Sequence, residues 1–351
     1  MKKWIALLLV LTMMLAMAAC GQNDTSVESS SEMKDSAVAE TTASHYPVTV
    51  TDQAGREVVI EKAPQRLISS YYITTSLLMA LDQDEYLVGV EDNADLRPIY
   101  GMSSPAILEL PSIGTAKELD LEACAALSPD LAILPMKVKD SVDALEELGI
   151  TVLLVNPESQ ELLIEMIQLV ATATNTEENA EALVGFIEAQ EEELTKSLAD
   201  VETPSVYLAS NSSFLSTAGN AMYQSDMIRL AGGINVAAEI EDTYWAEIDY
   251  EQLLIWDPEY IILPSSAKYT TEEVMADPNL AGCRAIMNGN VYQVPGHVES
   301  WDSPVPGSIL GAFWLANILH PEVMTDAECT NIMDEYYETL LRHRALGCVN
   351  K

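Results

Sequence analysis

Positive charge is what this 351-residue sequence has least of. It carries 17 Lys and Arg against 55 Asp and Glu, for a formal net charge of −38. A protein that binds nucleic acid needs clustered cations to neutralise phosphates, so this class is excluded. We interpret the acidic excess mainly as a determinant of solubility, and it also disfavours a highly anionic ligand.

Cysteine is also scarce, with five residues: Cys20, Cys124, Cys283, Cys329 and Cys348. None has the C-x-x-C spacing that predicts a metal site. Cys124 lies on the apolar face of a predicted helix, and we expect a buried thiol there. Cys329 and Cys348 could form a disulfide in an oxidising compartment, and the sequence leaves that pairing open.

Long apolar runs are limited to one, Ile5–Ala19, which is too short to cross a membrane comfortably. It ends in LAMAAC, and small residues before a cysteine in a secretory leader are typical of a bacterial lipobox. We predict a signal peptide over 1–19, lipidation of Cys20, and a disordered tether over 20–45, which is rich in Ser, Thr and acidic residues. The alternative is an ordinary signal peptide with an incidental cysteine. The predicted location is the extracytoplasmic face of a bacterial cell membrane.

One phrase of the sequence occurs twice. ELDLEACAALSPDLAIL begins at residue 118 and EIDYEQLLIWDPEYIIL begins at residue 247, and six of the 17 aligned positions are identical. Each copy predicts a short helix, a turn at Pro and a strand, and each keeps a glutamate at the same place, Glu122 and Glu251. We infer two similar α/β lobes. The alternative is a chance match between two helix–strand units.

Strand and helix patterns alternate over 46–172 and again over 202–351. Most of the strands are continuous apolar runs, which predicts parallel sheets covered on both faces. Between them, 173–201 has helical apolar spacing, with a helix start predicted at Asn175. The predicted fold is therefore α/β, with two parallel-sheet lobes joined by a single long α-helix. The segment 48–60 is predicted to form a hairpin.

The order of several motifs carries a resemblance to a known family. A lipobox, TDQAGREVVIEKAPQRLISS, LVGV, the repeated phrase, VYQVPG and PGSILGAFWLANILHPE together resemble class III, or helical-backbone, substrate-binding proteins of ABC importers for ferric siderophores, haem and cobalamin. The resemblance implies a monomer without enzymatic activity or resident cofactor, which serves an ABC permease and its ATPase. It also implies that one glutamate on each lobe docks on permease arginines, and Glu122 and Glu251 match these positions. The alternative is that both only complement a helix dipole.

The resemblance places the ligand in a cleft between the lobes, where loops follow the carboxyl ends of the strands. Two tryptophans in polar loops, Trp245 and Trp301, are expected on the cleft surface. Arg97 and Lys137 are candidates for an oxygen or propionate of the ligand. His297, with Glu299 or Tyr72, could contact a metal directly, although no metal site is otherwise predicted. The full set of ligand-binding candidates is Tyr71, Tyr72, Arg97, Lys137, Ser212, Trp245, His297, Glu299 and Trp301.

The expected ligand is a metal chelate, with an iron–siderophore first and haem or a corrinoid second. Ser76 stands where many members carry a glutamate, so this loop does not assign a subfamily ligand. A rival of another class is an extracytoplasmic two-lobe enzyme, but no G-x-S-x-G, Walker or H-E-x-x-H motif occurs. A bare divalent metal ranks low because only His297 is well placed. A helical connector predicts small closure of the lobes.

Overall fold

The computed structural model describes residues 45–241 and 245–339. The predicted signal peptide, Cys20, nearly all of the tether and Cys348 lie outside these residues. Within the described part of the chain, no helix is long and apolar enough to cross a membrane.

A hairpin precedes the first sheet. Strands β1 (Val48–Thr51) and β2 (Glu57–Ile60) pair antiparallel, as predicted. The turn is held by Asp52, whose Oδ1 accepts hydrogen bonds from the backbone N–H groups of Ala54 and Arg56. Gly55 adopts φ 78°, a conformation in which a side chain would be strained.

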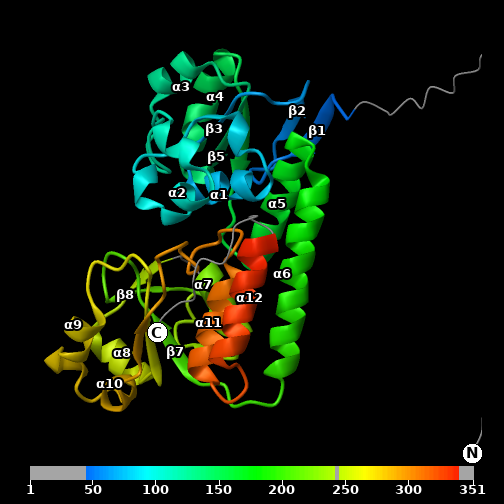
Figure 1. Cartoon of the computed structure of the whole chain (residues 1–351). Helices are drawn as coiled ribbons and strands as arrows, with labels where there is room; N and C mark the ends of the chain where they lie inside the picture. Colours follow the sequence, from blue (N-terminus) through cyan, green and yellow to red (C-terminus); the bar gives the residue numbers. More distant parts are fainter. Residues whose placement is uncertain (1–44, 242–244, 340–351) are drawn as a thin grey trace, which may run out of the picture. The chain divides into compact units, whose positions relative to one another are not determined.

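The N-terminal lobe, which comprises the elements from β1 to β6, is built on a parallel sheet of order β4-β3-β5-β6. All the side chains of β3 and β5 are buried, which explains why these strands read as apolar runs. Figure 1 shows α1 to α4 around this sheet. The strands are β3 (Leu67–Ser69), β4 (Leu87–Gly89), β5 (Leu131–Pro135) and β6 (Thr151–Val155), and the helices are α1 (Tyr72–Ala80), α2 (Pro98–Ser103), α3 (Leu121–Leu127) and α4 (Val142–Glu147).

The connection between the sheets contains two helices, α5 (Gln160–Thr174) and α6 (Glu177–Ser197), which pack side by side (Figure 1). The prediction that Asn175 starts a helix is wrong. This residue has left-handed φ and ψ of 57° and 49°, and its N–H donates to the carbonyl of Ala171, so it ends α5. Asparagine suits both kinds of helix end, and the sequence pattern alone did not separate them. Helix α6 follows after Thr176.

The C-terminal lobe, which comprises the elements from β7 to α12, has a second parallel sheet of order β12-β11-β7-β9 and a small antiparallel pair, β8 with β10. Two separate parallel sheets confirm the predicted two-lobe α/β class. Figure 1 shows α11 and α12 side by side next to α6. The strands are β7 (Ser205–Leu208), β8 (Ser216–Ala218), β9 (Ile234–Asn235), β10 (Trp245–Glu247), β11 (Tyr260–Leu263) and β12 (Val291–Gln293), and the helices are α7 (Tyr223–Leu230), α8 (Tyr250–Trp256), α9 (Thr271–Met275), α10 (Arg284–Asn288), α11 (Ile309–Leu319) and α12 (Asp326–Thr339).

The repeated phrase forms the same unit in each lobe, α3 with β5 and α8 with β11. Asp120 and Asp249 cap the two helices, each accepting a hydrogen bond from the backbone N–H three residues on. Ser128 and Asp257 end them in the left-handed conformation. The repeat therefore encodes matched helix starts and stops.

Candidate ligand-binding site

A small pocket of about 30 Å³ lies where loops of the two lobes meet. We call it the interlobe pocket. Its N-terminal side comes from α1 and from the turn before α2, and its C-terminal side from the loop after β12. The lobes also touch directly, because the N–H of Ile99 donates to the carbonyl of Val298 at 3.2 Å. The lining residues are Tyr72, Ser76, Leu96, Arg97, Pro98, Ile99, Gly296, Val298, Glu299, Ser300 and Val305.

Arg97 is the only Lys or Arg among the residues that line the interlobe pocket. Its guanidinium carbon lies 3.9 Å from the ring centre of Tyr72, a cation–π contact that holds both side chains at the pocket. Burial raises the pKa of the Tyr72 hydroxyl, while a hydrogen bond from Ser303 and the charge of Arg97 act in the opposite direction. Tyr71 extends the aromatic surface, with its ring edge-on to Tyr72 at 5.5 Å.

A buried polar network beneath α1 fixes the backbone that carries these tyrosines. Glu91 accepts hydrogen bonds from Thr75 and from Tyr100, each at 2.7 Å. The Tyr100 hydroxyl also lies 3.3 Å from the carbonyl oxygen of Tyr72. The sequence analysis did not select Glu91, although it follows β4 closely and that position is the signal that could have identified it. This network pre-organises the N-terminal side of the interlobe pocket.

Glu299 is a buried carboxyl group on the C-terminal side of the pocket. It accepts a hydrogen bond from the hydroxyl of Tyr337 at 3.2 Å, and burial raises its pKa to about 7. Asp302, three residues on, is also buried and accepts a hydrogen bond from Ser265 at 2.7 Å. Burial raises the pKa of Asp302, and the nearby charge of Arg97 works against this rise. Burial therefore favours the protonated form of both carboxyl groups, and of the two only Asp302 interacts with the charge of Arg97.

Trp301 was predicted on the cleft surface, and the structure instead places it in the core. Its side chain is 1% exposed, and its Nε1 donates to the hydroxyl of Tyr337 at 2.9 Å. The reason is tertiary, because α12 supplies the partner that lets a loop tryptophan be buried. Trp245, on β10, is 37% exposed and is not among the residues that line the interlobe pocket.

Three other predicted residues are exposed and do not line the interlobe pocket. Lys137 follows β5 and lies 3.9 Å from Glu158, which follows β6. His297 lines a different cavity, of about 700 Å³, beside β12 and Trp314. Ser212 lies in the loop between β7 and β8. No group of three or more His, Cys, Asp or Glu able to hold a metal occurs among the described residues, so direct metal contact by His297 stays a prediction.

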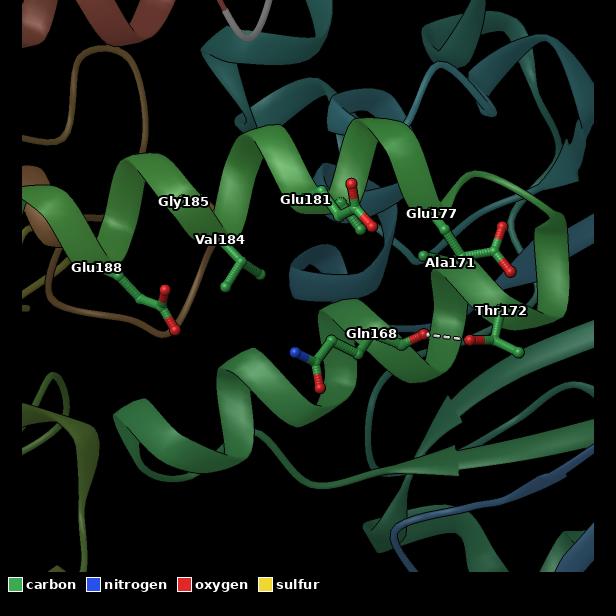
Figure 2. A pocket seen from close by; sticks show the side chains of 9 residues that line it. Gln168, Ala171, Thr172, Glu177, Glu181, Val184, Gly185 and Glu188 are labelled. Carbon is green, nitrogen blue, oxygen red and sulfur yellow. Dashed lines mark hydrogen bonds between the residues drawn. The ribbon is translucent and has the colours of Figure 1, made fainter.

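A further groove, of about 410 Å³, lies along the connecting helices rather than at the strand ends. Figure 2 shows its acidic side chains, Glu177, Glu181 and Glu188, along α6, with Gln168 and Thr172 facing them from α5. The groove is separate from the interlobe pocket, since the two share no lining residue.

The predicted docking glutamates, Glu122 and Glu251, are both exposed, in the first turns of α3 and α8. Cys124, on the same helix as Glu122, is buried as predicted, and burial raises the pKa of its thiol to about 11. Cys329 is buried too, and its proposed pairing with Cys348 falls outside the described residues.

The sequence profile of the family described as periplasmic binding protein matches residues 67–298, which is more than half of the chain. The chain belongs to the periplasmic binding protein family. The molybdate-binding protein MolA of Haemophilus influenzae is 23% identical over 84% of this chain and 90% of its own. Its molybdate-bound structure aligns with a TM-score of 0.75 over 85% of this chain and 98% of that one, at 22% identity.

Two other relatives cover similar spans. The uncharacterised ABC transporter substrate-binding lipoprotein YvrC of Bacillus subtilis is 25% identical over 92% of this chain and 98% of its own. A cobalamin-binding protein of Halobacterium salinarum is 23% identical over 79% of this chain and 75% of its own. The relatives whose ligands are named are binding proteins rather than enzymes. The structural likeness confirms the predicted fold.

The raised pKa of Glu299 makes the stability of this protein depend on pH. Below about pH 4.5, Glu299 is protonated in both the folded and the unfolded chain, so it does not lower the free energy of unfolding. As the pH rises from 4.5 to 7 only the unfolded chain loses this proton, so the free energy of unfolding should fall by roughly 3 kcal/mol and then level off. Urea titrations between pH 5 and pH 8 measure this fall. Glu299→Gln should flatten it and Glu202→Gln, at an exposed position, should not.

Proposed function

We propose that this protein is the extracytoplasmic substrate-binding lipoprotein of an ABC importer, anchored through Cys20, and that its ligand occupies the interlobe pocket. Membership of the periplasmic binding protein family supports the binding role. The relative YvrC, which is named as a lipoprotein, supports the anchor. The position of Tyr72, after a strand of the first sheet, and of Glu299, after a strand of the second, agrees with the rule that open parallel sheets bind ligands at the carboxyl ends of their strands.

The ligand we favour is a compact metal oxyanion of the molybdate type. The observation that carries this choice is the composition of the interlobe pocket, where Arg97 and Glu299 both line a cavity of only about 30 Å³. A protonated carboxyl group can donate a hydrogen bond to an anion, and an arginine supplies the opposite charge. Pockets for drug-sized ligands measure about 300–1,000 Å³. MolA, which is named as a molybdate-binding protein, is a relative in keeping with this choice.

A ferric siderophore, the ligand expected from the sequence, is the second candidate, with haem or a corrinoid behind it. The observation in its favour is the apolar rim of the interlobe pocket, which is lined by the exposed side chain of Leu96 and by Tyr72, whose ring contacts that of Tyr71. A flat or bulky chelate could lie against that rim. It would require the lobes to separate, against the contact between Ile99 and Val298.

Calorimetric titration of the purified protein distinguishes these ligands. Sodium molybdate should bind stoichiometrically, and sodium sulfate serves as the control for a tetrahedral anion without a metal. Binding of a ferric hydroxamate, haem or cyanocobalamin in place of molybdate would move the assignment to the second candidate. If none of these binds and the protein hydrolyses an ester or a phosphate instead, the enzyme alternative replaces the proposal.

A further inference from the structure

The outer surface of the C-terminal lobe carries a groove of about 630 Å³ around the predicted docking residue Glu251. We call it the C-lobe groove. It runs along α8, which Figure 1 shows beside α9 and α10, and its other lining residues are Glu239 and Ile240 and those at and after the end of β10. Its lining residues are Glu239, Ile240, Glu247, Ile248, Asp249, Glu251, Gln252, Ile255 and Trp256.

Comparison of the two copies of the repeated phrase shows that the helix at this groove carries larger exposed apolar side chains than its counterpart in the N-terminal lobe. Leu254 and Ile255, on the outer face of α8, are 39% and 70% exposed. The aligned positions in the N-terminal lobe are Ala125 and Ala126, on α3. Both helices start with the same cap and the same glutamate, so fold requirements do not explain the difference. Large apolar side chains left in water on one copy, and absent from the other, indicate a surface that is covered by a partner.

Charge is also distributed differently around the two helices. Four carboxylates line the C-lobe groove, at Glu239, Glu247, Asp249 and Glu251, and its described lining residues include no Lys or Arg. The indole Nε1–H of Trp256 donates to Glu239 at 3.3 Å, which helps to hold one wall. In the N-terminal copy, Lys117 directly precedes the phrase, where the C-terminal copy has an alanine. The described lining of the C-lobe groove therefore combines apolar side chains with four carboxylates, which we call its acidic rim.

We propose that the C-lobe groove receives a cationic, amphipathic segment of the permease, in which an apolar side chain lies on Ile255 and flanking Lys or Arg residues meet the acidic rim. This inference rests on the proposed function and adds an asymmetry to it. The C-terminal lobe anchors the complex through apolar burial and charge, whereas the N-terminal lobe contributes the charge of Glu122. A second copy of this chain is a poor occupant, because it too carries a net charge of −38.

Photo-crosslinking in membranes of the source bacterium tests this assignment. The full-length lipoprotein carries a photoreactive amino acid at position 252, in place of the uncharged Gln252 that lines the groove beside Glu251. The yield of crosslinked permease, identified by mass spectrometry, is measured against protein concentration. Adding Ile255→Ala should raise the concentration needed for half-maximal yield at least tenfold, because an apolar anchor is lost. Met287→Ala is the matched control, since Met287 is 63% exposed in the same lobe and does not line the groove.

The outcomes separate the inference from the function on which it rests. If Ile255→Ala leaves the crosslinking curve of the permease unchanged, the asymmetric anchor is wrong and docking through Glu251 stands. If the protein that carries only the photoreactive residue crosslinks to a second copy of itself, the groove is a dimer surface and the inference is overturned. If the probe at position 252 captures no permease at all, the proposed function and the inference both fail. Thermal unfolding checks that the exposed substitutions leave the fold unchanged.

Discussion

The double variant Glu122→Arg/Glu251→Arg should lose association with the permease by roughly a hundredfold or more. Each exposed carboxylate is proposed to meet an arginine across the interface, and reversal replaces an attraction by a like-charge contact. The measurement is the amount of permease that copurifies with the tagged lipoprotein from membranes, as a function of lipoprotein concentration. The affinity of the interlobe pocket for its ligand should not change, because neither glutamate lines that pocket.

Matched substitutions distinguish docking from a role in helix stability. Both glutamates lie in the first turn of a helix, where a negative charge is also favourable to the dipole. Glu272 occupies the same kind of position on α9, so Glu272→Arg controls for the loss of that interaction. Equal loss of association in the control, or full association of the double variant, would show that Glu122 and Glu251 are surface charges without a docking role.

The sheets of this fold were predictable because burial of both faces leaves a strong signal. Each strand of the two parallel sheets that was predicted is a short apolar run ended by a turn residue, and the repeated phrase fixed two of them together with their helices. Helix ends were less predictable. Asn175 satisfies the residue preferences of a helix start and of a helix end, and only the packing of α5 against α6 decides between them.

The candidate site was predictable in position and less so in composition. Counting forward from the strand ends selected Tyr72, Arg97 and Glu299, and these three side chains line the interlobe pocket. The same rule selected His297 and Trp301, each two positions from Glu299 in the sequence. His297 instead lines another cavity, and Trp301 is buried in the core. Strand order gives the edge of a sheet at which a loop lies, whereas the direction of each loop side chain depends on distant partners such as α12.

Loss of the guanidinium at Arg97 should weaken ligand binding by about 10- to 100-fold, the effect expected for one charge-assisted hydrogen bond to an anion. Arg97→Ala removes both this cation and the cation–π contact with Tyr72. Arg97→Lys keeps the charge but not the planar fork, so it should recover only part of the affinity. Calorimetric titration with molybdate measures both variants. Lys139→Ala, at an exposed position that does not line the interlobe pocket, is the control for net charge.

The direction of the pH effect on binding depends on Glu299, the carboxyl group that lines the interlobe pocket together with Arg97. If the ligand is an oxyanion in the interlobe pocket, Glu299 can donate a hydrogen bond to it only while protonated. The pKa of Glu299 is about 7, so affinity for molybdate should fall as the pH rises from 6 to 8, and Glu299→Gln should remove most of that fall. An affinity that instead rises over this range would mean that the carboxylates bind a cationic centre, which would favour a chelated metal over an oxyanion.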